Sequence, residues 1–279
     1  MIARIQLGIS TCPNDTFAFH GLLSGDVATP GLEFQIELHD VEVLNEALLA
    51  GRFDVAKGSF AAAFELGQER VLLPVGAALG YGNGPLVLAP DTDREPGQAR
   101  TVLGPGRHTT AELLFRLFHP EEHEVQSMIF SQIMGELEAG RADLGICIHE
   151  GRFTYAERGL RLVEDLGLRW EAETSCPLPL GGLFAKRALG STNLSAVQGA
   201  IEASLDYARE HPQRALVSMR KYAQEQSDAV LESHVELYVN DSTRHLDEIA
   251  EQAVQRLESE ARRMGRIGAD SPRLDVYRA

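Results

Sequence analysis

One histidine stands where a strand-like run of the sequence ends and polar residues begin. The run is apolar from Leu144 to Ile148, and His149 follows it directly. A free imidazole has a pKa of about 6.5, so it can take up or release a proton near neutral pH. The sequence therefore indicates His149 as a candidate general base. The alternative is a structural histidine that hydrogen-bonds a backbone carbonyl.

Two other short segments offer hydrogen-bond donors to an anion. The first is Lys57-Gly58-Ser59, at the end of another strand-like run, where the lysine could otherwise be a solvated surface charge. In the second, Thr109 and Thr110 stand just before a helical pattern. A helix start presents unpaired N–H groups and the positive end of the helix dipole. Both segments are therefore candidate anion-binding sites, although Thr109 with Glu112 also fits a capping box.

A repeated phrase predicts which elements position these residues. Ala-Gly-Arg-Phe-Asp-Val at 50–55 recurs as Ala-Gly-Arg-Ala-Asp-Leu at 139–144. Each copy ends a short amphipathic helix, which follows a strand-like run and a capping residue, and each copy precedes a second strand. The runs and caps are 32–38 with Asp40 and 125–130 with Ser131. Two unrelated helices could also end in this way, because glycine is common at helix ends.

A true repeat predicts two α/β lobes that face each other across a cleft. A strand–helix–strand unit gives a right-handed crossover and parallel strands, and ligands of such sheets bind beyond the carboxyl ends of the strands. We expect lobe 1 to comprise residues 1–90 and 187–279, including the C-terminal helices. Lobe 2 then comprises residues 91–186.

The strand-like and polar segments between the two lobes predict how the lobes are joined. Strand-like runs at 85–89 and 177–185 are the two crossings of a hinge, and a polar segment at 91–99 is a plausible link to the second lobe. Residues 270–279 are expected to form a poorly ordered tail.

The composition limits the partners and the compartment. The formal net charge of −15 over 279 residues argues against nucleic acid and anionic membranes, but not against a small anionic ligand. No run approaches the roughly 20 apolar residues of a membrane span, and the start lacks the pattern of a signal peptide. The three cysteines have no zinc-type spacing, so we expect no metal site and a cytoplasmic protein with reduced thiols.

Several longer strings resemble the 1,4-dihydroxy-6-naphthoate synthases of the futalosine route of menaquinone biosynthesis. The resemblance covers nearly the whole chain and is most specific in Cys-Pro-Asn-Asp-Thr-Phe and His-Glu-Gly-Arg-Phe-Thr-Tyr. The matching segments are 8–17, 57–59, 106–111, 148–155 and 178–182. One position departs from the family pattern: other members have a larger residue where this chain has Gly58. This difference concerns the shape of the pocket at that point and not the backbone donors.

The resemblance implies a periplasmic-binding-protein-like fold of type II, with two mixed sheets flanked by helices and joined by a two-strand hinge. It also implies a lyase that converts cyclic dehypoxanthinylfutalosine to 1,4-dihydroxy-6-naphthoate and dihydroxyacetone without metal or organic cofactor. By the same resemblance His149 is the proton acceptor, and Lys57-Gly58-Ser59 with Thr109 and Thr110 bind the small anionic substrate. A homodimer is compatible with the sequence, which does not fix the oligomeric state.

Three other functions fit parts of this pattern. Solute-binding proteins share the architecture and need no base, but they are exported. Chorismate dehydratase of the same pathway shares the fold without the Cys-Pro-Asn-Asp-Thr-Phe opening. A transcription-factor effector domain would call for a helix-turn-helix segment, which the sequence lacks.

Overall fold

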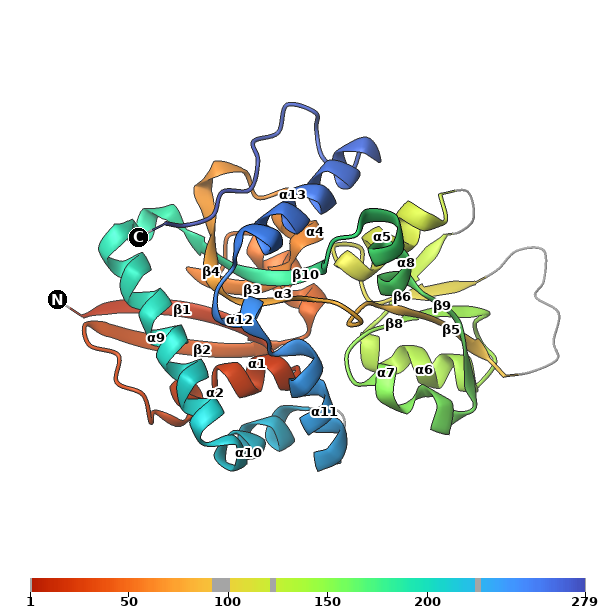
Figure 1. Cartoon of the computed structure of the whole chain (residues 1–279), viewed down its shortest axis with the longest axis horizontal. Coiled ribbons are helices and arrows are strands. Elements are labelled where there is room, and N and C mark those ends of the chain that lie inside the picture. Colours follow the sequence, from red (N-terminus) through yellow and green to blue (C-terminus); the bar gives the residue numbers. More distant parts are fainter. Residues whose placement is uncertain (1, 92–100, 121–123, 224–226, 279) are drawn as a thin grey trace.

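The computed structural model describes residues 2–91, 101–120, 124–223 and 227–278. Figure 1 shows two lobes side by side, each built on one sheet with helices packed against it. Each sheet has five strands and mixes parallel with antiparallel pairs. Two α/β lobes were expected from the repeat, and the mixed sheets agree with the fold that the resemblance implies.

The first sheet has the strand order β2-β1-β3-β10-β4. Strand β1 pairs in parallel with both β2 and β3, and β10 runs antiparallel between β3 and β4. The strands are β1 Ala3–Ser10, β2 Leu32–His39, β3 Val55–Ser59, β4 Arg70–Gly80 and β10 Leu178–Lys186.

The second sheet repeats this arrangement in the order β7-β6-β8-β5-β9. Here β6 pairs in parallel with β7 and β8, and β5 runs antiparallel between β8 and β9. The strands are β5 Leu86–Pro90, β6 Val102–Gly104, β7 Val125–Ser127, β8 Leu144–Cys147 and β9 Leu160–Asp165. The equal strand order makes the two lobes structural copies of one plan.

The repeated Ala-Gly-Arg phrase ends the crossover helix of each lobe in the same conformation. Gly51 and Gly140 have φ of +72° and +64°, which glycine adopts without the steric cost of a Cβ. The N–H of Gly51 bonds Leu48 O at 3.1 Å, and that of Gly140 bonds Leu137 O at 2.9 Å. Glycine therefore closes both helices with the same αL turn, as the repeat predicts.

The predicted caps of these two helices have different outcomes. Asp40 accepts a hydrogen bond from Glu42 N at 2.9 Å and caps α3, Val41–Leu49, as expected. The cap at Ser131 is wrong: α6 spans Phe130–Glu138, so Ser131 lies inside the first turn, after Ile129. Strand β7 ends at Ser127, two residues before that N-cap, so the chain turns into the helix earlier than the apolar pattern suggests.

Sheet membership places two strands across the predicted lobe boundaries. Hydrogen bonding assigns β5 to the second sheet and β10 to the first, so the crossings lie at 81–85 and 175–177. The predicted link at 91–99 lies outside the described residues, except for Asp91. Both strands that flank it, β5 and β6, belong to the second sheet, so the segment connects strands of one lobe.

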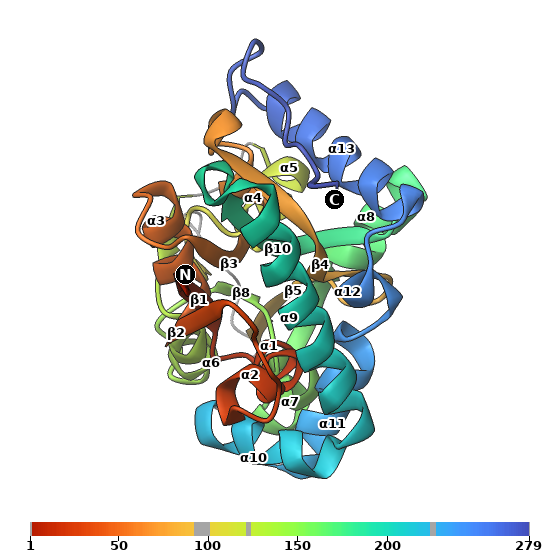
Figure 2. The same cartoon turned by 90° about the vertical axis from the view of Figure 1, so that its left-hand side faces the viewer.

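Helices cover both sheets (Figures 1 and 2). The long α9 contributes Val197 and Ile201 to the cluster formed by Ile5, Leu7 and Ile9 of β1. The other helices are α1 Pro13–Ala18, α2 His20–Ser24, α4 Phe60–Ala63, α5 Thr110–Phe118, α7 Gly151–Thr154, α8 Leu166–Thr174, α9 Gly190–Glu210, α10 Pro212–Tyr222, α11 Asp228–Tyr238, α12 Asp241–Arg244 and α13 Glu248–Arg263. Short 3₁₀ turns span Gly67–Glu69, Tyr155–Arg158 and Arg187–Leu189. In the described part of the chain, every helix is too short or too polar to traverse a bilayer.

The end of the chain is not a free tail, which corrects the expectation for residues 270–279. Leu72 N donates to Asp275 O and Tyr277 N donates to Leu72 O, each at 2.8 Å. Strand β4 is an edge strand of the first sheet. The C-terminal segment therefore pairs with backbone groups that would otherwise be unpaired at this edge.

Candidate active site

All the predicted site residues line one pocket between the carboxyl ends of the two sheets. His149 and the turn with Thr109 and Thr110 approach it from the second lobe, and Lys57-Gly58-Ser59 approaches it from the first. The repeat thus brings together segments that are far apart in the sequence.

His149 follows β8 with an unusual backbone conformation. Its φ is +58°, one of two positive values among non-glycine residues in the described ranges. This left-handed conformation costs free energy in a histidine, and such strain is concentrated at functional sites. The ring packs against the edge of Phe130 with 4.6 Å between centroids. The sharp turn after the strand therefore aims the imidazole at the cleft.

The two ring nitrogens of His149 have different surroundings. Nε2 lies 3.4 Å from Sγ of Cys12, which is the N-cap residue of α1. Burial raises the pKa of the Cys12 thiol, and the carboxylates of Glu150 and Asp15 raise it further, so the thiol is neutral. Among the described residues no hydrogen bond reaches Nδ1. Nδ1 can act as a base in the tautomer in which Nε2 carries the proton and donates it to Sγ.

Burial lowers the pKa of His149 to about 4. The carboxylate of Asp15 opposes this lowering of the pKa and the ammonium of Lys57 adds to it. The imidazole is accordingly neutral at pH 7 and can accept a proton. An anion bound beside it would favour the protonated form and raise this pKa toward neutrality.

Lys57 is a buried member of an ion pair, which excludes the alternative of a solvated surface charge. Its side chain is 8% exposed, and Nζ lies 2.8 Å from Oδ1 of Asp15 and 2.7 Å from Gly76 O. The second carboxylate oxygen of Asp15 accepts hydrogen bonds from Ser10 N at 3.2 Å and Ser10 Oγ at 2.7 Å. The positive charge at the floor of the pocket is thus balanced within the protein.

Ser59 and Gly58 are held by the crossover helix α3. Ser59 N donates to Oδ1 of the fully buried Asn45 at 2.8 Å, and Asn45 Nδ2 donates to Ser59 Oγ at 3.1 Å. A Cβ on Gly58 would lie 2.8 Å from Cδ2 of Leu48. A larger residue at position 58 would therefore press against Leu48 of α3. The glycine that replaces the larger family residue thus affects how β3 packs against this helix.

The hydroxyl groups of Thr109 and Thr110 are both engaged inside the protein. Thr109 Oγ1 accepts from Glu112 N at 3.2 Å and caps α5, but the reciprocal half of the expected capping box is absent, because Thr109 N donates to Gly106 O at 3.1 Å. Thr110 Oγ1 donates to Leu180 O at 2.8 Å and accepts from Ala61 N at 3.3 Å. The donors that this turn can offer to a ligand are hence the backbone N–H groups of Thr110 and Ala111, which have no acceptor within the helix.

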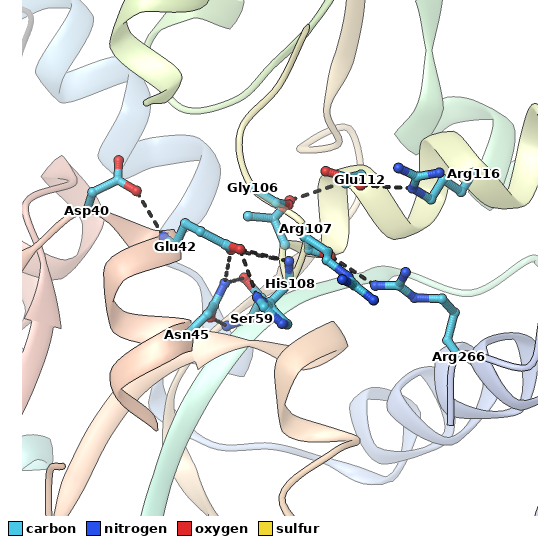
Figure 3. A network of polar contacts seen from close by, with 11 residues as sticks. Asp40, Glu42, Asn45, Ser59, Gly106, Arg107, His108, Glu112, Arg116 and Arg266 are labelled. Atoms are coloured by element: carbon cyan, nitrogen blue, oxygen red, sulfur yellow. Dashed lines mark hydrogen bonds and ion pairs between the residues drawn. The ribbon is translucent and has the colours of Figure 1, made fainter. Parts of the chain in front are cut away.

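A set of contacts across the cleft fixes the turn that carries these threonines (Figure 3). Glu42, in the first turn of α3, accepts from His108 N at 3.0 Å and from His108 Nδ1 at 2.8 Å. Gly106, with φ of +137°, leaves room for this carboxylate, because a Cβ there would lie 2.4 Å from Cδ of Glu42. Arg266 donates to Arg107 O at 3.0 Å. We call the Glu42–His108 contact the interlobe latch.

The comparisons with known proteins agree on one family. A protein-family model described as "Menaquinone biosynthesis" matches residues 5–263. The chain belongs to this family. A relative from Thermus thermophilus is 43% identical over 272 residues, which cover 96% of this chain and 97% of the relative. A second, from Streptomyces coelicolor, is 37% identical over 274 residues and 96% of each chain. Both relatives are named 1,4-dihydroxy-6-naphtoate synthase, so this family member is an enzyme of menaquinone biosynthesis.

Solved structures confirm the fold that the resemblance implies. A protein from Archaeoglobus fulgidus matches with a TM-score of 0.89 at 31% identity, over 95% of this chain and 98% of that one. The alkanesulfonate-binding protein of Xanthomonas axonopodis pv. citri matches at 0.71 and 14% identity, over 96% of each chain. A ligand-binding component of an ABC-type import system from Staphylococcus aureus matches at 0.70 and 12% identity, over 96% and 94%. At such low identity the last two show only the periplasmic-binding-protein-like fold.

Several residues that line the pocket or contact its lining residues were not assigned a role by sequence reasoning. Cys12, Asn14 and Asp15 belong to a string used for the resemblance, but no role followed from it. His234 and Tyr238 of α11 gave no signal, because with Leu231 they form the i, i+3, i+7 spacing of an ordinary buried helix face. No group of three or more His, Cys, Asp or Glu side chains within the described residues is placed to hold a metal ion.

Proposed function

We propose that the protein is a 1,4-dihydroxy-6-naphthoate synthase that acts as a carbon–carbon lyase. Its substrate is cyclic dehypoxanthinylfutalosine, and its products are 1,4-dihydroxy-6-naphthoate and dihydroxyacetone. The observation that carries the proposal is the neutral, strained His149, whose Nδ1 has no hydrogen-bond partner among the described residues and which lines the interlobe pocket. The names of the two relatives give the product, and the substrate and the lyase reaction are those that the sequence resemblance implies.

In the proposed reaction, His149 removes one proton from the substrate at Nδ1. The electron pair left behind drives cleavage of a carbon–carbon bond. The three-carbon fragment leaves with the electron pair of that bond as an enediolate, and the His149 imidazolium returns the proton to it to give dihydroxyacetone. The ring that remains becomes aromatic, and this supplies the driving force. In the proposed tautomer Nε2 carries the ring proton and donates it to Sγ of Cys12, which leaves the lone pair on Nδ1 for the substrate.

The substrate carboxylate is proposed to bind at the start of α5. Thr110 and Ala111 line the pocket, and their N–H groups belong to the first turn of α5, at the positive end of the helix dipole. On the facing lobe, Lys57-Gly58-Ser59 is proposed to contact the other end of the ligand. A carboxylate in this pocket also favours protonated His149, which brings the pKa of the base closer to the working pH.

The test is a substrate comparison with the purified protein. Cyclic dehypoxanthinylfutalosine is expected to give a naphthoate product, detected by mass and by absorbance, and chorismate is expected to remain unchanged. Loss of water from chorismate would instead support the dehydratase alternative. Tight binding of either compound without turnover would support a solute-binding protein.

A further inference from the structure

His234 is a fully buried histidine that lies directly behind the pocket wall. It comes from α11, next to α1, and its ring stacks on Tyr238 with 4.3 Å between centroids. Its Nε2 lies 3.1 Å from Oδ1 of Asn14 in α1, and its centroid is 6.3 Å from that of His149. Nδ1 of His234 has no hydrogen-bond partner among the described residues. A buried polar ring in this position needs a physical account.

Hydrogen-bond directions settle which atoms of this group carry protons. Oδ1 of Asp15 lies 2.8 Å from Lys57 Nζ and accepts from Asn14 Nδ2 at 3.0 Å. A carboxylate paired with an ammonium only accepts, so the amide nitrogen of Asn14 faces Asp15 and its oxygen faces His234. Nε2 of His234 must then be the donor, and Nδ1 holds the lone pair.

The charge state of His234 supports this direction. Burial lowers the pKa of His234 well below its ordinary value, and His149 lowers it further, so the ring is neutral. A neutral ring carries one N–H, and the contact with Asn14 uses it. The buried, unpaired Nδ1 costs free energy. This cost is offset if the hydrogen bond from Nε2 holds the side chain of Asn14 in one orientation.

Asn14 lines the pocket, and its amide nitrogen has a second N–H beyond the one directed at Asp15. We propose that this second N–H donates to a substrate oxygen that gains negative charge in the reaction, and that His234 is the positioning residue that keeps the carboxamide in this orientation. The inference rests on the proposed function, because it assigns one more contact in the same pocket. If the carboxamide rotated by 180°, its oxygen would face the Asp15 carboxylate and a donor would be lost from the pocket.

A double-mutant cycle tests whether His234 acts through Asn14. Asn14→Leu is expected to lower kcat/KM by roughly tenfold to a hundredfold, as for loss of a hydrogen bond to developing charge. His234→Phe alone is expected to lower it by roughly tenfold, mostly in kcat. In the Asn14→Leu background, His234→Phe is expected to cause no further loss. The same fractional loss in both backgrounds would overturn the proposal.

Two further variants separate positioning from general stability. His234→Gln keeps a donor at the place of Nε2 and is expected to restore kcat to within about threefold of the wild type. His20→Phe is the matched control, since His20 is also buried with one partner, Ser218, and one unpaired ring nitrogen, but lies away from the pocket. It is expected to lower the melting temperature and leave kcat unchanged. Equal losses of kcat in His20→Phe and His234→Phe would also overturn the proposal.

A measurement without substrate keeps the inference independent of the reaction. Ring ¹⁵N chemical shifts of His234 at pH 7 are expected to show a protonated Nε2 and an unprotonated Nδ1, with both tautomers populated in Asn14→Leu. A proton on Nδ1 in the wild type would overturn the inference. If the wild type forms no naphthoate, the proposed function fails, and the ring measurement then decides on the positioning of Asn14 by itself.

Discussion

His149 owes its chemistry to its backbone as much as to its ring. The positive φ turns the imidazole out of the line of β8 and toward the first lobe, where Cys12 engages one nitrogen. The sequence could predict a strand-end histidine, because that depends on neighbouring residues only. It could not predict Cys12 as the partner, which lies 137 positions away in the chain.

The lowered pKa of His149 predicts the pH below which activity falls. The profile of kcat/KM against pH reports the free enzyme, so activity should stay constant from pH 7 toward 5 and fall as the pH passes through about 4. Steady-state rates across this range measure it. The limb of kcat is expected at higher pH, because bound substrate carboxylate stabilises the imidazolium. A kcat/KM limb near the ordinary value of about 6.5 would show that burial does not control the base.

At the scale of elements, the repeat predicted the crossover helices but not what clamps them together. The αL glycines and the Asp40 and Thr109 caps depend on a few consecutive residues, so the sequence contained the information. The partner of Thr110, Leu180, is 70 positions distant, and only the fold brings it close. The Thr110 hydroxyl, which was expected to contact substrate, instead hydrogen-bonds α5 to β10.

This contact changes what Thr110→Val is expected to do. The substitution keeps the shape but leaves Leu180 O and Ala61 N without their partner, at a cost of about 1–3 kcal/mol for each buried group. We expect a lower melting temperature together with a higher KM, because the helix start that would hold the substrate shifts. Calorimetry and steady-state kinetics measure both. Normal stability with a higher KM would instead indicate that the hydroxyl contacts substrate.

The interlobe latch predicts a second effect on substrate binding. Glu42→Ala removes the acceptor of two His108 donors and should favour the open cleft, which raises KM several-fold with a smaller change in kcat. Glu46→Ala is the control, since Glu46 is an exposed residue of the same helix. Solution scattering should show a larger radius of gyration for Glu42→Ala alone. Identical scattering and KM in the two variants would remove the latch from the account.

At the scale of the whole molecule, the net charge says little about the pocket. The chain carries −15 overall, yet the pocket combines a balanced ion pair, a helix start and the neutral His149, with the neutral His234 behind its wall. The two-lobed plan could be predicted because the same phrase occurs at 50–55 and at 139–144, once in each lobe. The contribution of α11 could not be predicted, because His234 and Tyr238 belong to a helix that begins about 80 residues after His149 in the sequence.

The pKa values of His149 and His234 also predict how stability depends on pH. Their pKa values are lower in the folded protein than the roughly 6.5 of an unfolded chain, about 4 for His149 and well below the ordinary value for His234. The unfolded state therefore binds more protons as the pH falls. Their contribution is complete above about pH 6.5 and is lost progressively toward pH 4. Urea melts between pH 7.5 and 4.5 should show a shallower decline for His149→Asn with His234→Gln, and an unchanged slope would contradict this.

The most direct test of the central claim is turnover by a His149→Asn variant. Asparagine tolerates a positive φ, so the turn after β8 should keep its conformation while the base is removed. His119→Asn, on the same lobe but outside the pocket, is the control. Naphthoate formation from cyclic dehypoxanthinylfutalosine is expected to fall about 10²–10⁴-fold in His149→Asn at an unchanged melting temperature, and to stay normal in the control. Turnover by folded His149→Asn within a few-fold of the wild type would contradict the account.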